Sequence, residues 1–424
     1  MNSTELKQKL ASGALDRFGE LYADPKAQAE RMTAAVGAFE KIFGEGREVS
    51  LFSVPGRTEI VGNHTDHNHG CVLAGAIDRD IIALAAKNGE RVIRFFSEGY
   101  PMAEIPLDRV EDPEAFPNFS SDSLIAGMCT AFRKNGKQIC GFDAYATTEV
   151  LKGSGISSSA AYEVMIGNIL NHLANGGQIP NEEIAKYAQY AENVHFGKPC
   201  GLMDQMACAV GGFVFIDFAD PASPVIEPIS FSLTDAGYEL CIVNTGGNHA
   251  DLNEDYASVP AEMKAVAALL GKEVLRGVTE EQIREKIPEL REAVGDRAIL
   301  RALHFVEENK RVLVARDALK AGDVPAFLDV VTASGRSSFM YLQNVYTVKN
   351  VREQGLSLAL ALTDRALAGQ DCAFRVHGGG FAGTIQVFLR REHADEYCDR
   401  IESVFGKGAA MRLRIRPLGA VKLF

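Results

Sequence analysis

The stretch GSGISSSAA at residues 153–161 stands between GFDAYATTEVL, which alternates like a strand, and YEVMIGNILNHLA, which has the apolar spacing of a helix. Gly153 and Gly155 permit backbone conformations that other residues rarely adopt, and they let a ligand approach the chain closely. Three serines then open the helix, where free N–H groups and the positive end of the helix dipole favour a phosphate. These serines are Ser157, Ser158 and Ser159.

Two better-known phosphate loops do not fit this stretch. It lacks the Gly-Lys-Ser/Thr of the Walker loop. The spacing of its glycines also differs from that of the dinucleotide fingerprint. A glycine turn followed by a serine N-cap is the alternative interpretation, since serine is a common cap.

A second glycine cluster, RVHGGGFAGT at residues 375–384, lies between two predicted strands. Successive glycines at such a place indicate that the backbone passes close to another group. A long hairpin turn is the alternative.

The third cluster, PGRTEIVGNHTDHNHG at residues 55–70, concentrates histidine and charged residues. Such residues can hold a metal, or they can form a polar pocket for a hydroxyl-rich ligand such as a sugar. The histidines do not follow the one-face spacing of a helix or the H-x-H-x-D-H order of known metal motifs, and Asn68 and the glycines predict a loop. A solvated turn is the third interpretation.

Together these clusters resemble the GHMP kinase superfamily, and its galactokinase branch in particular. The galactokinase signature, roughly G-R-x-N-x-x-G-E-H-T-D-Y-N-x-G, stands here as G-R-T-E-I-V-G-N-H-T-D-H-N-H-G. The stretches AENVHFGKPCGLMDQ at 191–205 and NTGGNHADLNEDY at 244–256 are also similar to family segments. The five motifs extend from residue 52 to about residue 384.

The resemblance implies a two-domain α+β kinase fold with its active site in the cleft between the domains. The mixture of predicted strands and helices, without steady βαβα alternation, independently favours α+β over a doubly wound parallel sheet. We expect an N-terminal helical extension at 1–47, a first kinase domain at 48–235 with the sugar and phosphate loops, and a second domain at 236–424. The boundary near residue 235 depends on the turn signal DAG.

The resemblance also implies roles for single residues. Arg57 would stabilise charge on the transferring phosphoryl group, and Asp204 would orient or deprotonate the anomeric hydroxyl. Ser159 and Glu192 would hold Mg²⁺. ATP phosphates would be bound by Gly153, Gly155, Ser157, Ser158 and Ser159. The sugar would be contacted by Asn63, His64, Asp66, Gly201 and Tyr256. Phosphoryl transfer needs mainly positioning and charge neutralisation, which these residue types supply; a purely structural Arg57–Asp204 ion pair is the alternative.

Several positions depart from the family pattern. Asn63 stands where the family has a sugar-binding glutamate, Glu59 replaces an asparagine, His67 replaces a tyrosine and Ala382 replaces a glycine. An amide at position 63 would tolerate a uronic acid that a carboxylate would repel. The chain has no tryptophan, so Phe116 or Phe119 is expected to stack on adenine.

These observations predict an ATP-dependent sugar 1-kinase, with galactose as the first expected substrate. Two alternatives stay open: a kinase for a related sugar such as galacturonate or N-acetylgalactosamine, and a non-catalytic sugar sensor. The complete SGISSSAA stretch and the presence of Asp204 favour catalysis over a sensor.

Composition excludes several other classes. The 424 residues carry a net charge of −12, which disfavours binding to a nucleic-acid backbone. The eight cysteines form no C-x-x-C pair, a pattern that favours reduced thiols in a cytosol. The sequence shows no signal peptide and no apolar run of about 20 residues. We therefore expect a cytoplasmic protein without nucleic-acid or membrane partners, monomeric or weakly homo-oligomeric.

Overall fold

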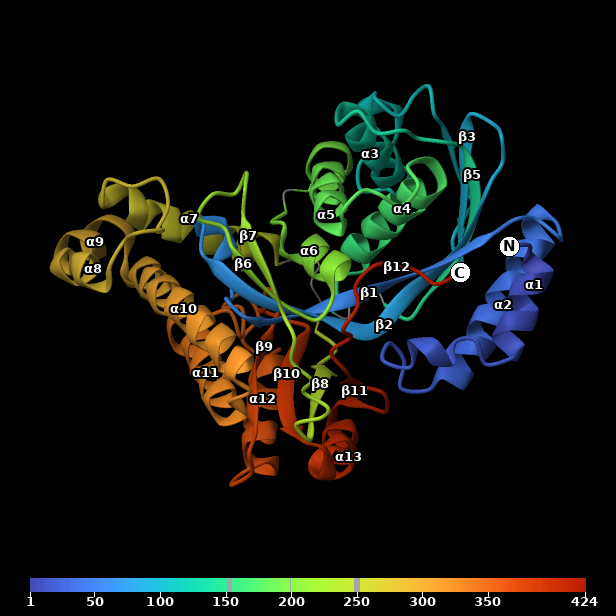
Figure 1. Cartoon of the computed structure of the whole chain (residues 1–424). Helices are drawn as coiled ribbons and strands as arrows, with labels where there is room; N and C mark the ends of the chain where they lie inside the picture. Colours follow the sequence, from blue (N-terminus) through green and yellow to red (C-terminus); the bar gives the residue numbers. More distant parts are fainter. Residues whose placement is uncertain (151–154, 199, 248–251) are drawn as a thin grey trace.

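The computed structural model describes residues 1–150, 155–198, 200–247 and 252–424, and it contains two sheets with helices packed on them (Figure 1). The first sheet has the strand order β12-β1-β2-β5-β3-β4, and β6 and β7 extend it from the other half of β2. Within this sheet only β3 and β5 are parallel among the described strands. Its strands are β1 (Ser50–Val61), β2 (Cys71–Lys87), β3 (Val92–Ser97), β4 (Ala103–Pro106), β5 (Phe142–Thr148), β6 (Phe213–Asp217), β7 (Val225–Ile229) and β12 (Val421–Lys422).

The first sheet is covered on both faces because its central strands alternate between two apolar cores. Ile82 and Leu84 of β2 join the core under the N-terminal helices, whereas Ala83 and Ala85 join the core under the central helices. The N-terminal helices are α1 (Ser3–Ala11) and α2 (Pro25–Phe43). The central helices are α3 (Ser121–Lys134), α4 (Ser158–Ala174), α5 (Asn181–Tyr190) and α6 (Met203–Val210), with the π-helical turn η4 (Ala191–Phe196) after α5.

The second sheet is antiparallel throughout its described strands, in the order β11-β8-β10-β9. Its strands are β8 (Tyr238–Asn244), β9 (Ala373–His377), β10 (Thr384–Arg390) and β11 (Ala410–Leu413). Figure 1 places this sheet below the first, with the long helix α10 beside both. The helices of this half are α7 (Asn253–Leu269), α8 (Glu280–Glu285), α9 (Ile287–Val294), α10 (Asp296–Ala321), α11 (Val324–Ser337), α12 (Gly355–Ala366) and α13 (Ala394–Phe405), and the π-helical turn η5 (Ser338–Leu342) follows α11.

Strand β1 differs from its predicted form in a way that matters for the site. The sequence analysis predicted a loop for the cluster at 55–70, and that prediction was wrong for its first part, since β1 continues through Pro55-Gly56 to Val61. The register against β2 shifts between Pro55 and Arg57, as in a β-bulge, so the proline interrupts the ladder without ending the strand. Arg57 and Glu59 therefore lie on a strand rather than in a loop.

The expected helical extension at 1–47 contains two α-helices, α1 and α2, separated by residues 12–24. The helix that begins at Asn181 changes from α-helix to π-helix at Ala191. No helix among the described residues is long and apolar enough to cross a membrane.

Both ends of the chain are attached to the first sheet through one buried carboxylate, Asp80 of β2. Arg31 of α2 donates to Asp80 Oδ1 at 2.7 Å, and Tyr22 donates to Oδ2 at 2.7 Å. From the C-terminal segment, Arg416 Nη1 lies 3.2 Å from Oδ2, and Ser53 of β1 donates to the same oxygen. Burial alone would raise the pKa of Asp80, but the two arginines lower it below its usual value.

We predict that Asp80→Asn lowers the free energy of unfolding by about 3–5 kcal/mol, because it leaves the fully buried Arg416 with an uncompensated charge. Urea unfolding followed by circular dichroism measures the effect. The matched control is Glu289→Gln, which removes the exposed ion pair with Lys286 and should change stability by about 0.5 kcal/mol or less. Equal losses in the two variants would contradict the anchoring role of Asp80.

Candidate active site

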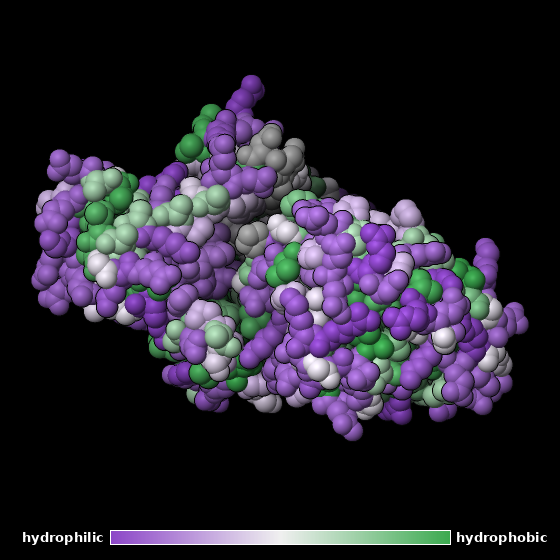
Figure 2. Space-filling view, turned by 90° about the horizontal axis from the view of Figure 1, so that it is seen from above, coloured by the Kyte–Doolittle hydropathy of each residue, from purple (hydrophilic) through white to green (hydrophobic). Residues whose placement is uncertain are grey.

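The residues singled out from the sequence gather where β1 meets the second sheet. Thr58 Oγ1 lies 3.0 Å from His377 Nε2 of β9, and Arg375 of β9 donates to the Ile60 carbonyl at 2.8 Å. Seen from above, the molecule shows two lobes with a hollow between them (Figure 2). The site therefore lies at the junction of the two sheets.

Arg57 and Asp204 form a bidentate ion pair at the centre of this junction. Arg57 Nε and Nη2 lie 2.6 and 2.7 Å from the two oxygens of Asp204, which begins α6. The remaining arm of the guanidinium, Nη1, donates to the Gly155 carbonyl at 2.6 Å. Ser157 Oγ donates to Asp204 as well. One guanidinium thus joins β1, α6 and the loop before α4.

The exposure and protonation of the pair suit it for chemistry as well as for structure. The Asp204 side chain is 30% exposed, whereas that of Arg57 is 10% exposed. Burial alone would raise the pKa of Asp204, but the charge of Arg57 and hydrogen bonds from Arg57 and Ser157 lower it below its usual value. Asp204 is therefore an ionised hydrogen-bond acceptor that a ligand can reach.

The described part of the glycine–serine loop forms an open helix N-terminus. Gly155 has φ +74°, and a Cβ there would lie 2.9 Å from Thr384 Oγ1, so glycine is needed. Ser157 occupies the N-cap position of α4 but makes no capping hydrogen bond, because its hydroxyl is turned to Asp204. The serine-cap interpretation is thereby excluded. Ser158 and Ser159 begin the helix, and Gly153 lies outside the described residues.

A buried group of oxygen atoms lies beside this helix start. Glu192 Oε1, from the π-helical turn η4, lies 3.5 Å from Ser159 Oγ and 3.1 Å from Lys198 Nζ. Gln205 Nε2 donates to Glu192 at 2.7 Å and to Glu163 at 3.2 Å. Burial and the charge of Glu192 raise the pKa of Glu163 well above its usual value, and Glu163 Oε1 has no hydrogen-bond partner among the described residues.

This donor set fits a hard cation. Hydroxyl and carboxylate oxygens converge from α4 and η4, as Mg²⁺ prefers, and the Glu192 oxygen that faces Ser159 already accepts from the Lys198 ammonium, which Mg²⁺ would have to displace. Mg²⁺ typically takes only one or two protein oxygens and completes its shell with phosphates and water. The histidine-rich loop is different: no three His, Cys, Asp or Glu side chains in the described parts of the chain converge to hold a metal.

The histidine-rich segment between β1 and β2 faces the glycine loop at 378–380. His64 has a left-handed backbone with φ +58°, and its Nε2 lies 3.0 Å from the Gly379 carbonyl. Tyr256 of α7 donates to the Gly380 carbonyl at 2.9 Å. Burial and the charge of His67 lower the pKa of His64 to about 4, so its imidazole is neutral at neutral pH.

The glycine segment is the turn of the antiparallel β9–β10 hairpin, and close backbone approach explains its glycines. A Cβ at Gly379 would lie 2.6 Å from the Tyr256 ring. A Cβ at Gly201 would clash with Asp66 Oδ2, so Asp66 and Gly201 are also adjacent. Asn63 is fully buried, and its amide donates to Glu59 and to the Gly378 carbonyl.

Sequence reasoning missed some residues that complete the site. Glu163 follows Ser159 by one helical turn, and this spacing was a usable signal. Lys198 and Gln205 lie inside the quoted stretch at 191–205 but were not singled out. Asn344 and Arg375 come from distant segments, and no local pattern connects them to the loop after β1.

Of the two phenylalanines expected near adenine, Phe119 has the ring available for stacking. Its side chain is 68% exposed, and the ring stands edge-on to Phe196 with centroids 5.4 Å apart. Phe116 is instead packed against the main core.

Two family models match the chain. The GHMP kinases N terminal domain matches residues 123–212, and the galactokinase galactose-binding signature matches residues 37–87. The first range contains the described part of the phosphate loop, and the second contains the histidine-rich segment.

Known proteins match over most of the length. A galactokinase of Actinobacillus pleuropneumoniae is 31% identical over 378 residues, which are 86% of this chain and 93% of the relative. A galactokinase of Streptomyces coelicolor is 29% identical over 392 residues, which are 91% of this chain and 96% of the relative.

Solved structures match in fold. Lactococcus lactis galactokinase complexed with galactose superimposes with a TM-score of 0.77 at 24% identity, covering 92% of this chain and 99% of that one. The mevalonate kinase of Methanococcus jannaschii gives a TM-score of 0.60 at 14% identity, covering 87% and 98%. The predicted two-domain α+β kinase fold is confirmed, whereas the boundaries at residues 47 and 235 stay predictions.

Proposed function

The chain belongs to the galactokinase family, and from this premise we propose that it is an ATP-dependent galactose 1-kinase, which converts D-galactose and ATP to galactose 1-phosphate and ADP. One observation carries the proposal. The Arg57 guanidinium is bonded both to the Asp204 carboxylate and to the Gly155 carbonyl of the phosphate loop. A carboxylate for the nucleophile and a cation for the transferring group are thus held together.

In the proposed mechanism, Asp204 accepts a hydrogen bond from the anomeric hydroxyl of galactose and orients or deprotonates it. Its lowered pKa keeps it ionised, so positioning of the nucleophile is its first task. Arg57 lies against the same carboxylate and stabilises negative charge on the transferring phosphoryl group. The free N–H groups at the start of α4 bind the ATP phosphates, with Gly153, Gly155 and the three serines forming the loop.

We propose that Ser159 and Glu192 hold Mg²⁺ when ATP is bound. The ion would neutralise phosphate charge and orient the phosphates. The chain's own part is to present the Ser159 hydroxyl and the Glu192 carboxylate, which Gln205 holds in place at 2.7 Å.

The sugar would lie between the segment after β1 and the glycine loop at 378–380. Proposed contacts are His64, Asp66, Gly201 and Tyr256. The neutral imidazole of His64 can donate or accept, and Asp66 can accept from sugar hydroxyls. We further propose a cytoplasmic enzyme, monomeric or weakly self-associating; its eight cysteines are all free, which supports a reducing compartment.

ADP release from ATP tests the function. We expect release with galactose, and weaker or no release with galacturonate, N-acetylgalactosamine, arabinose and glucose. Sugar binding without any ADP release would instead support the sensor alternative.

We predict that Asp204→Ala lowers kcat by about 100-fold or more, the scale expected for a catalytic acid–base group. The affinity for ATP should fall much less than kcat, because Arg57 keeps its bond to the Gly155 carbonyl of the phosphate loop. Steady-state kinetics with both substrates varied measures this. Wild-type turnover in Asp204→Ala would show that the Arg57–Asp204 ion pair has a purely structural role.

We predict that EDTA abolishes activity and that Mg²⁺ restores it. Glu192→Gln should raise the Mg²⁺ concentration needed for half-maximal activity by about tenfold or more, because it removes the charged ligand. A readout independent of turnover is Mn²⁺ binding in the presence of ATP, followed by electron paramagnetic resonance. Stoichiometric zinc recovered with the protein would contradict the assignment.

We predict that Phe119→Ala raises the KM for ATP by about tenfold, since loss of ring stacking costs about 1–1.5 kcal/mol. The KM for galactose should stay within a factor of two. The control is Phe116→Leu, which keeps the core apolar. A larger ATP effect in Phe116→Leu than in Phe119→Ala would assign adenine stacking to Phe116.

A further inference from the structure

Asn63, which the sequence placed among the sugar contacts, has its entire side-chain amide engaged by the protein. Its Nδ2 donates to Glu59 Oε1 at 2.9 Å and to the Gly378 carbonyl at 2.8 Å. Its Oδ1 accepts from Asn344 Nδ2 at 2.8 Å and from Ser338 Oγ at 3.3 Å. An amide has two donor hydrogens and two acceptor lone pairs, and all four are used here.

The backbone of Asn63 is held as firmly as its side chain. His304 Nε2 of α10 lies 2.9 Å from the Asn63 carbonyl, and the Asn63 N–H donates to Glu308 of the same helix at 3.4 Å. The residue as a whole is fully buried. Partners on β1, on α10, around η5 and on the glycine loop therefore meet at this one residue.

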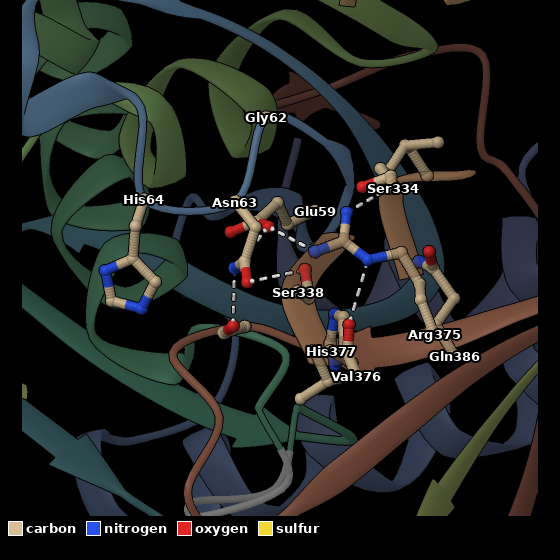
Figure 3. A network of polar contacts seen from close by, with 12 residues as sticks. Glu59, Gly62, Asn63, His64, Ser334, Ser338, Arg375, Val376, His377 and Gln386 are labelled. Carbon is tan, nitrogen blue, oxygen red and sulfur yellow. Dashed lines mark hydrogen bonds and ion pairs between the residues drawn. The ribbon is translucent and has the colours of Figure 1, made fainter. Parts of the chain in front are cut away.

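A buried ion pair fixes the orientation of the amide (Figure 3). Arg375 Nη2 of β9 lies 3.2 Å from Glu59 Oε1, the same oxygen that accepts from Asn63. Burial raises the pKa of Glu59 above its usual value, although Arg375 and Arg57 oppose this. The arrangement requires a donor at position 63, because a second carboxylate there would face Glu59 at hydrogen-bond distance.

The residue after Asn63 shows what this attachment achieves. His64 takes the left-handed backbone conformation at φ +58°, which costs a non-glycine residue free energy unless its surroundings enforce it. Figure 3 shows the His64 ring turned away from the Glu59–Arg375 pair. Asn63 is bonded to the Gly378 carbonyl and His64 to the Gly379 carbonyl, so two consecutive residues are hydrogen-bonded to two consecutive glycines of the loop.

We propose that Asn63 is a positioning residue rather than a sugar contact: its four-way amide, oriented by Glu59 and Arg375, fixes the backbone that presents His64 and Asp66 to the sugar. This inference rests on the proposed galactose site. It assigns to Glu59, Asn63 and Arg375 a joint role in substrate affinity although none of them touches the substrate.

Asn63→Asp is the first test, because it keeps the shape and replaces both donors with acceptors. We expect the Kd of galactose, measured by calorimetry without ATP, to rise about tenfold or more. The KM for ATP should stay within a factor of two. The control is Asn168→Asp, which places the same charge at another buried amide, in α4, and should leave the galactose Kd unchanged.

Deoxy sugars separate positioning from contact. Galactose lacking the 2-, 3-, 4- or 6-hydroxyl is titrated into wild type and Asn63→Asp. Because a positioning residue acts through both His64 and Asp66, Asn63→Asp should bind every one of these sugars more weakly than wild type does. A direct contact loses its effect with the one sugar that lacks the contacted hydroxyl, and that outcome would overturn the proposal.

The isosteric exchange Glu59→Gln with Asn63→Asp tests the pairing. It keeps one amide and one carboxylate in contact, so it should bind galactose at least about fivefold more tightly than Asn63→Asp alone. A double variant no better than the single one would contradict the joint role.

Folding is checked by measuring the melting temperature of each variant and assaying well below it. If Asn63→Asp does not fold, Ser338→Ala removes one hydrogen bond that the amide oxygen accepts, and it should weaken the binding of every sugar, by about twofold for galactose. No change, or a change confined to one deoxy sugar, would contradict the proposal. If wild type itself does not bind galactose, the proposed function fails instead.

Discussion

A charge buried between two sheets needs a partner, and the Arg57–Asp204 pair meets this constraint at the centre of the molecule. An unpartnered charge at such a place would cost several kcal/mol, so the guanidinium is bonded on three sides. Because its partners belong to α6 and to the loop before α4, pairing the charge also fixes the phosphate loop relative to β1. The geometry of the proposed catalytic pair is thus a consequence of how the charge is accommodated.

Buried charges are also paired around the proposed sugar site. Glu59 is paired with Arg375, and Glu308 accepts from Ser334 and pairs with Arg311. Burial would raise the pKa of Glu308, but His304 and the nearby arginines lower it to about 2. These charges attach the segment after β1 to α10, α11 and β9. The two sheets are therefore held together by polar groups that would be costly to separate.

Local patterns in the sequence predicted the parts of this structure that depend on local physics. The strand expected in GFDAYATTEVL and the helix expected in YEVMIGNILNHLA are present as β5 and α4. Strand β1 runs through Pro55 because pairing with β2 on both sides of the proline outweighs the local breaker. The partners of Asn63 come from residues 338, 344 and 378, and a single sequence has no signal that brings such distant segments together.

The contact between Glu59 and Asn63 changes what two departures from the family pattern mean. The family places an amide at position 59 and a carboxylate at position 63, and this chain has the reverse. Since the two side chains are hydrogen-bonded to each other, the two departures amount to one exchange of an amide and a carboxylate between neighbouring positions. The carboxylate stands at position 59 instead of position 63, where Arg375 pairs with it. The two positions together therefore still carry one carboxylate. Under the proposal that Asn63 does not touch the sugar, its amide neither attracts nor repels a group at the sugar's sixth carbon, and tolerance of galacturonate would require a cation facing that carbon.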